Sequence, residues 1–347
     1  MEHADFISLR KKVLELDPGL PFQKKYPGHI VFGLGWMCFV AAVITVNLTY
    51  DLSLGLKLLS SLALGIAFSS LAFFNHELLH GTMIKSTFWM HVLAYPGFFI
   101  LALSPELWRT WHNQLHHFNT NQLGGMDPDL AGDWQRLKDL GIRKRTVDIL
   151  PGGNNFLAAI FMVIAFNLQC LNVTWVRSKE RPKIYASMNR TLVNIESLAY
   201  YAIWIALAVI LPFEQFLYLF LIPLFFTNSV IINFVGVPHN MRPLSKENRP
   251  LLTTISLKVP RIVNWLAMNF CYHCEHHIFP EANHKFLPRV HTVLVKEYSD
   301  QYYFVPYFKA LAALYTSPRA YFDEDHLFNP HTGEKTNMHQ MARERFR

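Results

Sequence analysis

Residues 30–48 read IVFGLGWMCFVAAVITVNL, a run of 19 residues without a charged side chain. About 20 apolar residues in a helix cross the roughly 30 Å hydrocarbon core of a bilayer. Three further runs have the required length and apolar character: 54–74, 191–210 and 216–235. The sequence therefore predicts an all-α membrane protein with four transmembrane helices.

Two of these four runs contain one charged residue each. Lys57 stands near the start of run 54–74, where its long side chain can reach the interface. Glu196 is the one charge within 191–210. Pro223 in the fourth run predicts a kink, which membrane helices tolerate.

The composition of the whole chain agrees with a membrane protein. Among the 347 residues, 51% are hydrophobic and 16% are charged, whereas about 25% of residues in soluble chains are charged. Aromatic residues make up 14%, which excludes disordered, collagen-like and coiled-coil proteins. Four Cys are too few for a disulfide scaffold in a chain of this length.

Two other apolar stretches are expected to lie in the membrane interface. Residues 89–103 are too short to span and contain Pro96 and Gly97, which indicates an interfacial or re-entrant segment. Residues 156–176 are long enough to span, but basic segments flank both ends and the second half is polar. Because positive residues gather on one side of a membrane protein, we place this stretch in the interface as well.

The basic residues predict the orientation. All but Lys57 of the 32 Lys and Arg residues fall in segments 1–29, 75–155, 177–190 and 236–347. The positive-inside rule places these segments in the cytoplasm, so the four spans form two hairpins with both termini on the cytoplasmic side. The first 29 residues lack the apolar core of a signal peptide. We interpret residues 1–316 as one integral-membrane domain and the polar residues 317–347 as a loosely ordered tail.

Histidine is the second unusual feature, with 17 in the chain. Eight of them occur in three clusters, His76-Glu-Leu-Leu-His80, His112-Asn-Gln-Leu-His116-His117 and His273-Cys-Glu-His276-His277. Residues three or four apart share a face of a helix, so each cluster is expected to present imidazoles to a common side. The predicted topology places all three in a cytoplasmic helical cap. His239 follows the fourth span on the same side and is a ninth candidate.

These histidines are numerous enough for a centre with more than one metal ion. Eight imidazoles exceed the four ligands of a tetrahedral zinc site and suffice for two metals. Isolated histidines such as His29, His91 and His284 are expected to be ordinary interfacial side chains, because histidine is commonly half-buried.

The three clusters resemble the histidine boxes of the membrane fatty acid desaturase/hydroxylase superfamily. The resemblance covers about residues 30–290, including the paired spans, and extends to Asn119-Thr120-Asn121, Asp127-Pro128-Asp129 and Ile278-Phe279-Pro280. Two details depart from the pattern. Three residues separate His112 from His116 where many members have two, and the extra ligand before the third box is carried only by His239.

The resemblance implies a non-haem di-iron centre with the ligands His76, His80, His112, His116, His117, His239, His273, His276 and His277. Such a centre uses O2 to oxidise an unactivated C–H of a lipid acyl chain, and we expect desaturation to a carbon–carbon double bond. Hydroxylation, carotenoid ketolation and decarboxylation to a terminal alkene stay open. The carboxylates of Glu77, Asp127 and Glu275 could orient ligand imidazoles.

A position-selective oxidation needs a narrow apolar tunnel beside the metal. Residues 88–103 and 156–176 are candidates for its walls, with Trp108 and Trp111 near the second box. The chain shows no haem-binding or dinucleotide motif, so the electrons must come from a separate protein. A donor of the ferredoxin, rubredoxin or cytochrome b5 type is expected, since the basic face suits an acidic partner or anionic lipid. Nucleic acid is not an expected partner.

Two functions from other classes explain part of the pattern. His76 to His80 also matches the HExxH motif of zinc metalloproteases, but that function leaves six boxed histidines without a role. A transporter or haem carrier would place polar groups in mid-bilayer between broken helices, whereas these clusters lie at the ends of spans. Metal content separates the three: two irons per chain indicate the oxidase, one zinc the protease, and haem the carrier.

Overall fold

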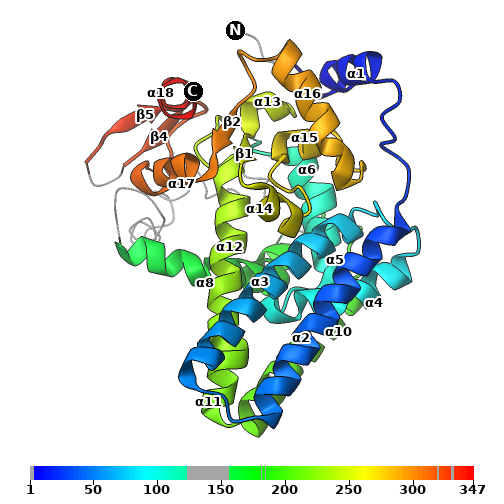
Figure 1. Ribbon diagram of the computed structural model, residues 1–347. Coiled ribbons are helices and arrows are strands. Elements are labelled where there is room, and N and C mark those ends of the chain that lie inside the picture. The colour runs from blue at the N-terminus through cyan, green and yellow to red at the C-terminus, as the bar shows by residue number, and fades with distance from the viewer. Residues whose placement is uncertain (1–3, 123–155, 181, 184, 319, 330–331) are drawn as a thin grey trace.

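A computed structural model describes residues 4–122, 156–180, 182–183, 185–318, 320–329 and 332–347. Two helical hairpins form its elongated part (Figure 1). The first joins α2 (Ile30–Thr49) to α3 (Leu54–Leu79). The second joins α10 (Arg190–Ile210) to a continuous helix made of α11 (Phe213–Phe216), a π-helical turn (Leu217–Leu221) and α12 (Ile222–His239). Both connecting turns lie at the same end of the molecule.

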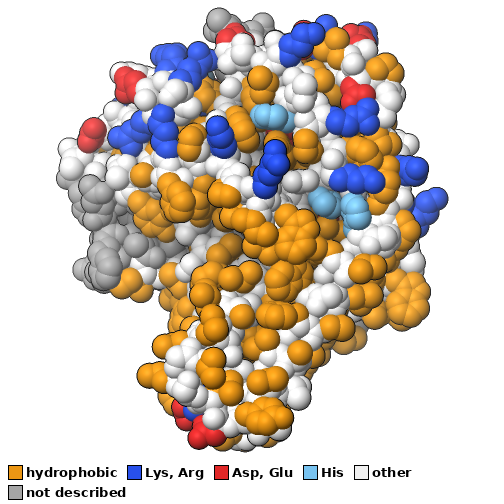
Figure 2. All heavy atoms as spheres, viewed as in Figure 1, with side chains coloured by type: hydrophobic (Ala, Val, Ile, Leu, Met, Phe, Trp, Pro, Cys, Tyr) orange, Lys and Arg blue, Asp and Glu red, His pale blue; other side chains and the backbone are white. Residues whose placement is uncertain are grey.

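In the described part of the chain, four helices are long and apolar enough to cross a membrane: Pro27–Thr49, Leu54–Leu79, Arg190–Ile210 and Phe213–His239. They confirm the four predicted spans. Figure 2 shows hydrophobic side chains over the hairpins, whereas Lys and Arg lie mainly over the opposite half. Exposed apolar residues such as Val31, Leu59 and Ile205 belong to the hairpin surface. Such a continuous apolar surface suits lipid rather than water.

The two hairpins pack against each other through α3 and α12. Gly65 allows this close approach, because a Cβ at this position would lie 2.6 Å from the ring of Phe226. At the turn end, Lys57 forms ion pairs with Asp51 (3.4 Å) and Glu214 (2.9 Å) and so joins the two turns. The charged side chains of Lys57 and Glu214 are therefore paired with each other at the end of the molecule that carries the two turns. A π-helical turn precedes Pro223, where the sequence predicts a kink.

The stretch that contains residues 89–103 is sharply bent. Helix α4 (Thr87–Phe98) and a 3-10 turn (Phe99–Leu101) meet the next helical segment at 95°. That segment consists of α5 (Pro105–Trp108), a π-helix (Arg109–His116) and α6 (His117–Asn119). The bend agrees with a re-entrant segment or a broken span.

The second apolar stretch forms α8 (Phe156–Asn172), a π-helical turn (Val173–Arg177) and α9 (Ser178–Glu180). Helix α8 lies across α12 in Figure 1 and contacts it. It is not among the four candidate spans found in the described residues. Its place in the membrane interface stays a prediction.

The end opposite the turns carries a layer of short elements that we call the cap. Its helices are α1 (Phe6–Leu16), α13 (Pro250–Thr253), α14 (Arg261–Leu266), α15 (His273–Ile278), α16 (Leu287–Glu297), α17 (Tyr307–Thr316) and α18 (Met338–Phe346). Strands β1 (Ser256–Lys258) and β2 (Phe304–Pro306) pair in parallel. Strands β3 (Ala320–Tyr321), β4 (His326–Phe328) and β5 (Lys335–Asn337) form an antiparallel sheet. Short 3-10 turns cover Pro27–His29 and His284–Phe286.

The expectation of a loosely ordered tail after residue 316 was wrong. Tyr321, Leu327 and Phe346 are buried in the same hydrophobic core as the spans. The Tyr321 hydroxyl donates to the carbonyl of Arg242 (3.0 Å), which joins the tail to the segment after α12. The tail is polar on average, but its few large apolar side chains are buried in the core.

Candidate metal centre

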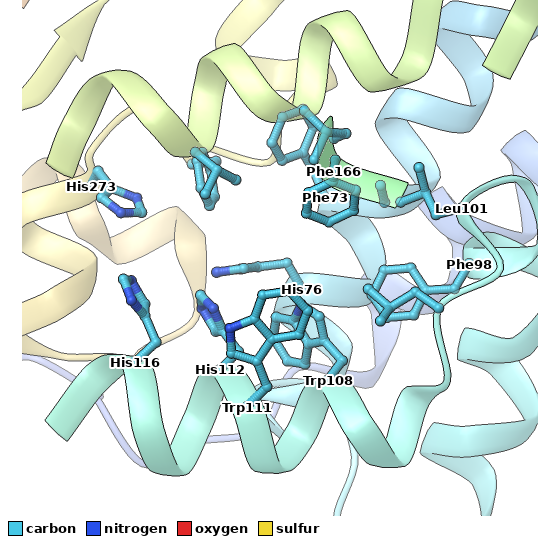
Figure 3. Close-up of a pocket in the computed structure, with 15 residues that line it drawn as sticks. Phe73, His76, Phe98, Leu101, Trp108, Trp111, His112, His116, Phe166 and His273 are labelled. Carbon is cyan, nitrogen blue, oxygen red and sulfur yellow. The ribbon is translucent and has the colours of Figure 1, made fainter. Parts of the chain in front are cut away.

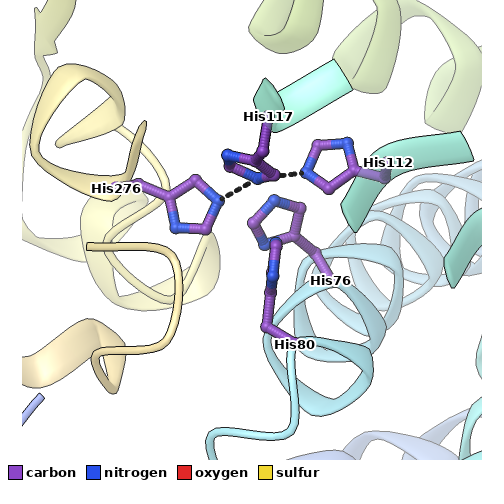
Figure 4. Close-up of side chains that lie close together, drawn as sticks. All are labelled: His76, His80, His112, His117 and His276. Atoms are coloured by element: carbon purple, nitrogen blue, oxygen red, sulfur yellow. Dashed lines mark hydrogen bonds between the residues drawn. The ribbon is translucent and has the colours of Figure 1, made fainter. Parts of the chain in front are cut away.

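The first of two histidine clusters combines all three boxes. His76 and His80 come from the end of α3, His112 and His117 from the second box, and His276 from α15. One ring nitrogen of each lies within 4.8 Å of the others. Nε2 of His117 is 3.1 Å from Nε2 of His112 and 3.1 Å from Nε2 of His276. Figure 4 shows the five rings converging from three separate helical segments.

The second cluster contains His116, His239, His273 and His277, all buried. Nε2 of His239, at the end of α12, lies 3.2 Å from Nε2 of His116 and 2.6 Å from Nε2 of His273. Nε2 of His277 is 3.2 Å from Nε2 of His273. The two clusters together hold all nine histidines that the sequence singles out.

The clusters divide the second and third boxes in a way that helical spacing alone does not predict. His112 and His116 do face the same side, with stacked rings 5.1 Å apart, yet they belong to different clusters. His112 is grouped instead with His117, five residues later. The π-helix over Arg109–His116 explains this grouping, because the backbone N–H of His117 bonds the carbonyl of His112. In the third box, His273 and His277 share a cluster and His276 enters the other.

The spacing of the ring nitrogens fits metal coordination. Imidazole nitrogens bind a metal at roughly 2.0–2.1 Å, so neighbouring ligands lie about 2.9–3.4 Å apart. Four of the five Nε2 pairs above fall in this interval. In the first cluster, Nε2 of His76 and Nε2 of His80 are buried without a hydrogen-bond partner among the described residues. A buried nitrogen left without a partner costs about 1–3 kcal/mol, and a bound cation would satisfy it.

The cap histidines are held neutral. Burial lowers the pKa of His276 to about 3, and it also lowers the pKa values of His273 and His277 well below the ordinary value for histidine. Neutral imidazole is the form that binds metal ions. Each cluster found in the described residues consists of histidine alone, a donor set that suits iron, copper, nickel or zinc.

Glu77, Asp127 and Glu275 are the carboxylates that the sequence analysis proposes to orient ligand imidazoles. Glu77 accepts the backbone N–H of His284 (3.1 Å) and lies 3.8 Å from Nδ1 of His76. Glu275 is bonded to Ser256, to Tyr302 (2.5 Å) and to Nδ1 of His291 (3.0 Å), and none of its described bonds reaches a histidine of the clusters. Asp127 lies outside the described residues.

An apolar pocket opens beside both clusters (Figure 3). His76 and His112 of the first cluster, and His116 and His273 of the second, form one side of it. The remaining wall consists of Ala72, Phe73, Phe98, Leu101, Leu103, Trp108, Trp111, Phe166, Ile231, Val235 and Phe270. Trp108 and Trp111 were named from the sequence as tunnel candidates, and both line this pocket. The Trp108 ring stacks on His112 at 4.4 Å.

Several pocket residues were missed by the sequence reasoning. Phe73 precedes His76 by three residues, and Phe270 precedes His273 by three. Helical periodicity places such residues one turn from a ligand on the same face, so this signal could have found Phe73. Val235 precedes His239 by four residues and carried the same signal, whereas Ile231 lies two turns before that ligand.

A buried polar network centred on Glu196 connects α10 to the helix that carries the second box. Glu196 of α10 accepts a hydrogen bond from the Ser104 hydroxyl (2.5 Å) and one from the backbone N–H of Glu106 (3.1 Å). Its other oxygen lies 2.7 Å from Nδ1 of His91. The network joins α10 to the start of the helix that carries His112. A lone carboxylate in a predicted span was the available signal, since charges inside a membrane require partners.

The fold and the site define a class: helical membrane proteins with a buried, histidine-rich centre beside an apolar pocket. The family model for fatty acid desaturases matches residues 54–309, which include every histidine of both clusters, and the chain belongs to this family. No curated protein matches the chain. The family confirms the resemblance drawn from the boxes. It implies an oxidoreductase that acts on fatty acyl lipids, and together with the clusters it indicates a metal centre.

Proposed function

We propose that this protein is a di-iron desaturase that introduces a carbon–carbon double bond into a lipid acyl chain. The observation that carries the proposal is the position of the apolar pocket, which is walled by histidines of both clusters at once. An acyl chain in that pocket would lie beside both metals. The all-histidine donor sets and the family membership support the same function.

In this proposal each cluster holds one iron. His76, His80, His112, His117 and His276 would bind the first, and His116, His239, His273 and His277 the second. When bound, the irons supply the O2-dependent oxidation of an unactivated C–H. The protein's part is to hold the ligands neutral, to fix the acyl chain against them and to exclude water from the pocket. Trp108, whose ring contacts His76 and His112, and Phe270, whose ring contacts His76, are placed to exclude water from the pocket.

The reaction needs electrons from outside the chain. Converting a CH2–CH2 unit and O2 into CH=CH and two water molecules consumes two electrons and two protons. We propose a ferredoxin, rubredoxin or cytochrome b5 type of protein as donor, approaching a cap that faces the cytoplasm. The Lys and Arg side chains over the cap half in Figure 2 support this orientation through the positive-inside rule.

The surroundings of Glu77 weigh against a zinc protease. In an HExxH protease this residue acts as general base on a metal-bound water. Here the Glu77 carboxylate is bonded by the backbone N–H of His284 and by the Thr82 hydroxyl (3.3 Å). The cluster next to it also contains three further histidines, which a single tetrahedral zinc would not require.

Product analysis tests the proposed reaction. Cells that express the chain, and matched cells that express His276→Ala, are compared by mass spectrometry of total lipid acyl chains. We expect species two mass units lighter only with the unaltered chain, and oxygen-containing species in their place would identify a hydroxylase. Acyl chains that are identical in both cultures would contradict the proposal.

A further inference from the structure

Thr120 connects the two boxes of the second cluster through one hydroxyl group. The residue follows α6 and is 1% exposed. Its Oγ1 lies 2.6 Å from the backbone carbonyl of His116 and 3.2 Å from Nδ1 of His277. His116 and His277 belong to the same cluster but come from the second and the third box.

The direction of both hydrogen bonds follows from counting protons. A threonine hydroxyl has one proton, and a carbonyl oxygen can only accept, so the proton of Thr120 is directed to His116. The hydroxyl can then only accept from His277, which means that the proton of the neutral His277 ring is on Nδ1. Nε2 of His277 is left with its lone pair, and this atom faces Nε2 of His273 at 3.2 Å.

We infer that Thr120 is a positioning residue that fixes the tautomer of His277 and so directs its Nε2 lone pair to the metal of the second cluster. The inference rests on the proposed metal centre. Ligand imidazoles in metalloproteins usually donate their second N–H to a polar group, and loss of that group costs about 10–100-fold in metal affinity. By contrast, Nδ1 of His276 is buried without a hydrogen-bond partner in the described part of the chain.

Iron binding by the full-length protein in detergent tests this role. Ferrous iron is titrated under nitrogen into metal-free wild type, Thr120→Val and Thr120→Ser, and bound iron is counted by elemental mass spectrometry. We expect two tight sites in the wild type. Thr120→Val should keep one and bind the second iron about 10–100-fold more weakly, with the Mössbauer signal of one site lost. Thr120→Ser, which retains the hydroxyl, should restore both.

Thr174→Val is the matched control. The Thr174 hydroxyl is buried and also donates to the carbonyl four residues earlier, that of Cys170 (2.7 Å), but it bonds no histidine among the described residues. It should bind both irons with wild-type affinity. Equal affinity of Thr120→Val and wild type for both irons would overturn the inference, whereas a wild type that binds no iron would instead refute the proposed centre.

Misfolding of Thr120→Val is resolved by a second variant. Thr120→Ala removes the hydroxyl without the branched methyl groups of valine, and helix content and a monodisperse profile show whether it folds. A folded Ala variant that loses one tight site supports the tautomer role. Failure of both variants to fold, with Ser folding normally, would overturn it, because the hydroxyl would then serve the fold rather than the ligand.

Discussion

Nε2 of His112 and Nε2 of His117 lie 3.1 Å apart although the two histidines are five positions apart in the sequence. On an ideal α-helix, residues five apart point about 140° away from each other. The π-helix over Arg109–His116 brings them into register. The additional residue between His112 and His116 is therefore accommodated by one wide helical turn, a feature that often marks functional sites.

Deleting Gln114 should preserve the first cluster. The deletion removes the additional residue of the π-helix, so His112 and His117 become four residues apart and share a face of a regular α-helix. We expect unchanged iron per purified chain. Gln114→Ala should match it, because Gln114 is exposed and its side chain accepts a hydrogen bond from the Ser187 hydroxyl. Loss of the first iron in the deletion variant alone would show that the π-helix itself is required.

Replacing any boxed histidine by Ala should abolish desaturation. The two clusters share one pocket, so the loss of one ligand affects a centre that acts as a unit. For His116→Ala we expect activity to fall by more than the roughly 100-fold seen when only supporting groups are lost. Product yield measured by lipid mass spectrometry checks this. His326→Ala, at a surface histidine that pairs with Asp323, should retain activity. A fully active His116→Ala would contradict the nine-ligand centre.

Filling the pocket should block the substrate and spare the metal. Ala72 lines the pocket one turn before His76, and Ala72→Leu places three more carbons there, at a cost of about 1–3 kcal/mol in overpacking. We expect little product from long acyl chains and an unchanged iron content. Ala63→Leu, a similar change at a position of α3 outside the pocket lining, is the comparison. Normal turnover by Ala72→Leu would place the acyl chain elsewhere.

Removing the Glu196 carboxylate should destabilise the fold. Glu196→Ala leaves Nδ1 of His91, the Ser104 hydroxyl and the backbone N–H of Glu106 without this partner. Breaking such a buried network costs about 3–5 kcal/mol. The midpoint of denaturant unfolding in detergent should fall accordingly. Glu214→Ala removes an exposed ion pair with Lys57 at the hairpin turn and should cost less than about 1 kcal/mol. Equal effects of the two variants on the unfolding midpoint would argue against a stabilising role of the Glu196 network.

The tail can be tested for its part in the core. Leu327 on β4 is fully buried, and Leu327→Ala should lower the free energy of unfolding by about 2–5 kcal/mol. Phe322, which is 36% exposed, provides the comparison, and Phe322→Ala should have a clearly smaller effect. Two equally mild variants would restore the original expectation of a loose tail.

Much of the architecture was predictable because membrane spans are a local property. Length and hydropathy of the runs 30–48, 54–74, 191–210 and 216–235 are enough to identify them, since each backbone must satisfy its own hydrogen bonds in lipid. The tail was mispredicted for the opposite reason. Tyr321 and Leu327 are isolated apolar residues in a polar segment, and only the core that receives them shows their role.

The sequence by itself determined the four spans and the nine histidines, because both depend on residue type and spacing along one helix. Only the tertiary structure decided which histidines share a cluster. That partition depends on a π-helical turn in the second box and on where α3, α12 and α15 end relative to each other. The same convergence made the pocket wall, since Phe73 and Val235 line one cavity only when α3 and α12 pack together.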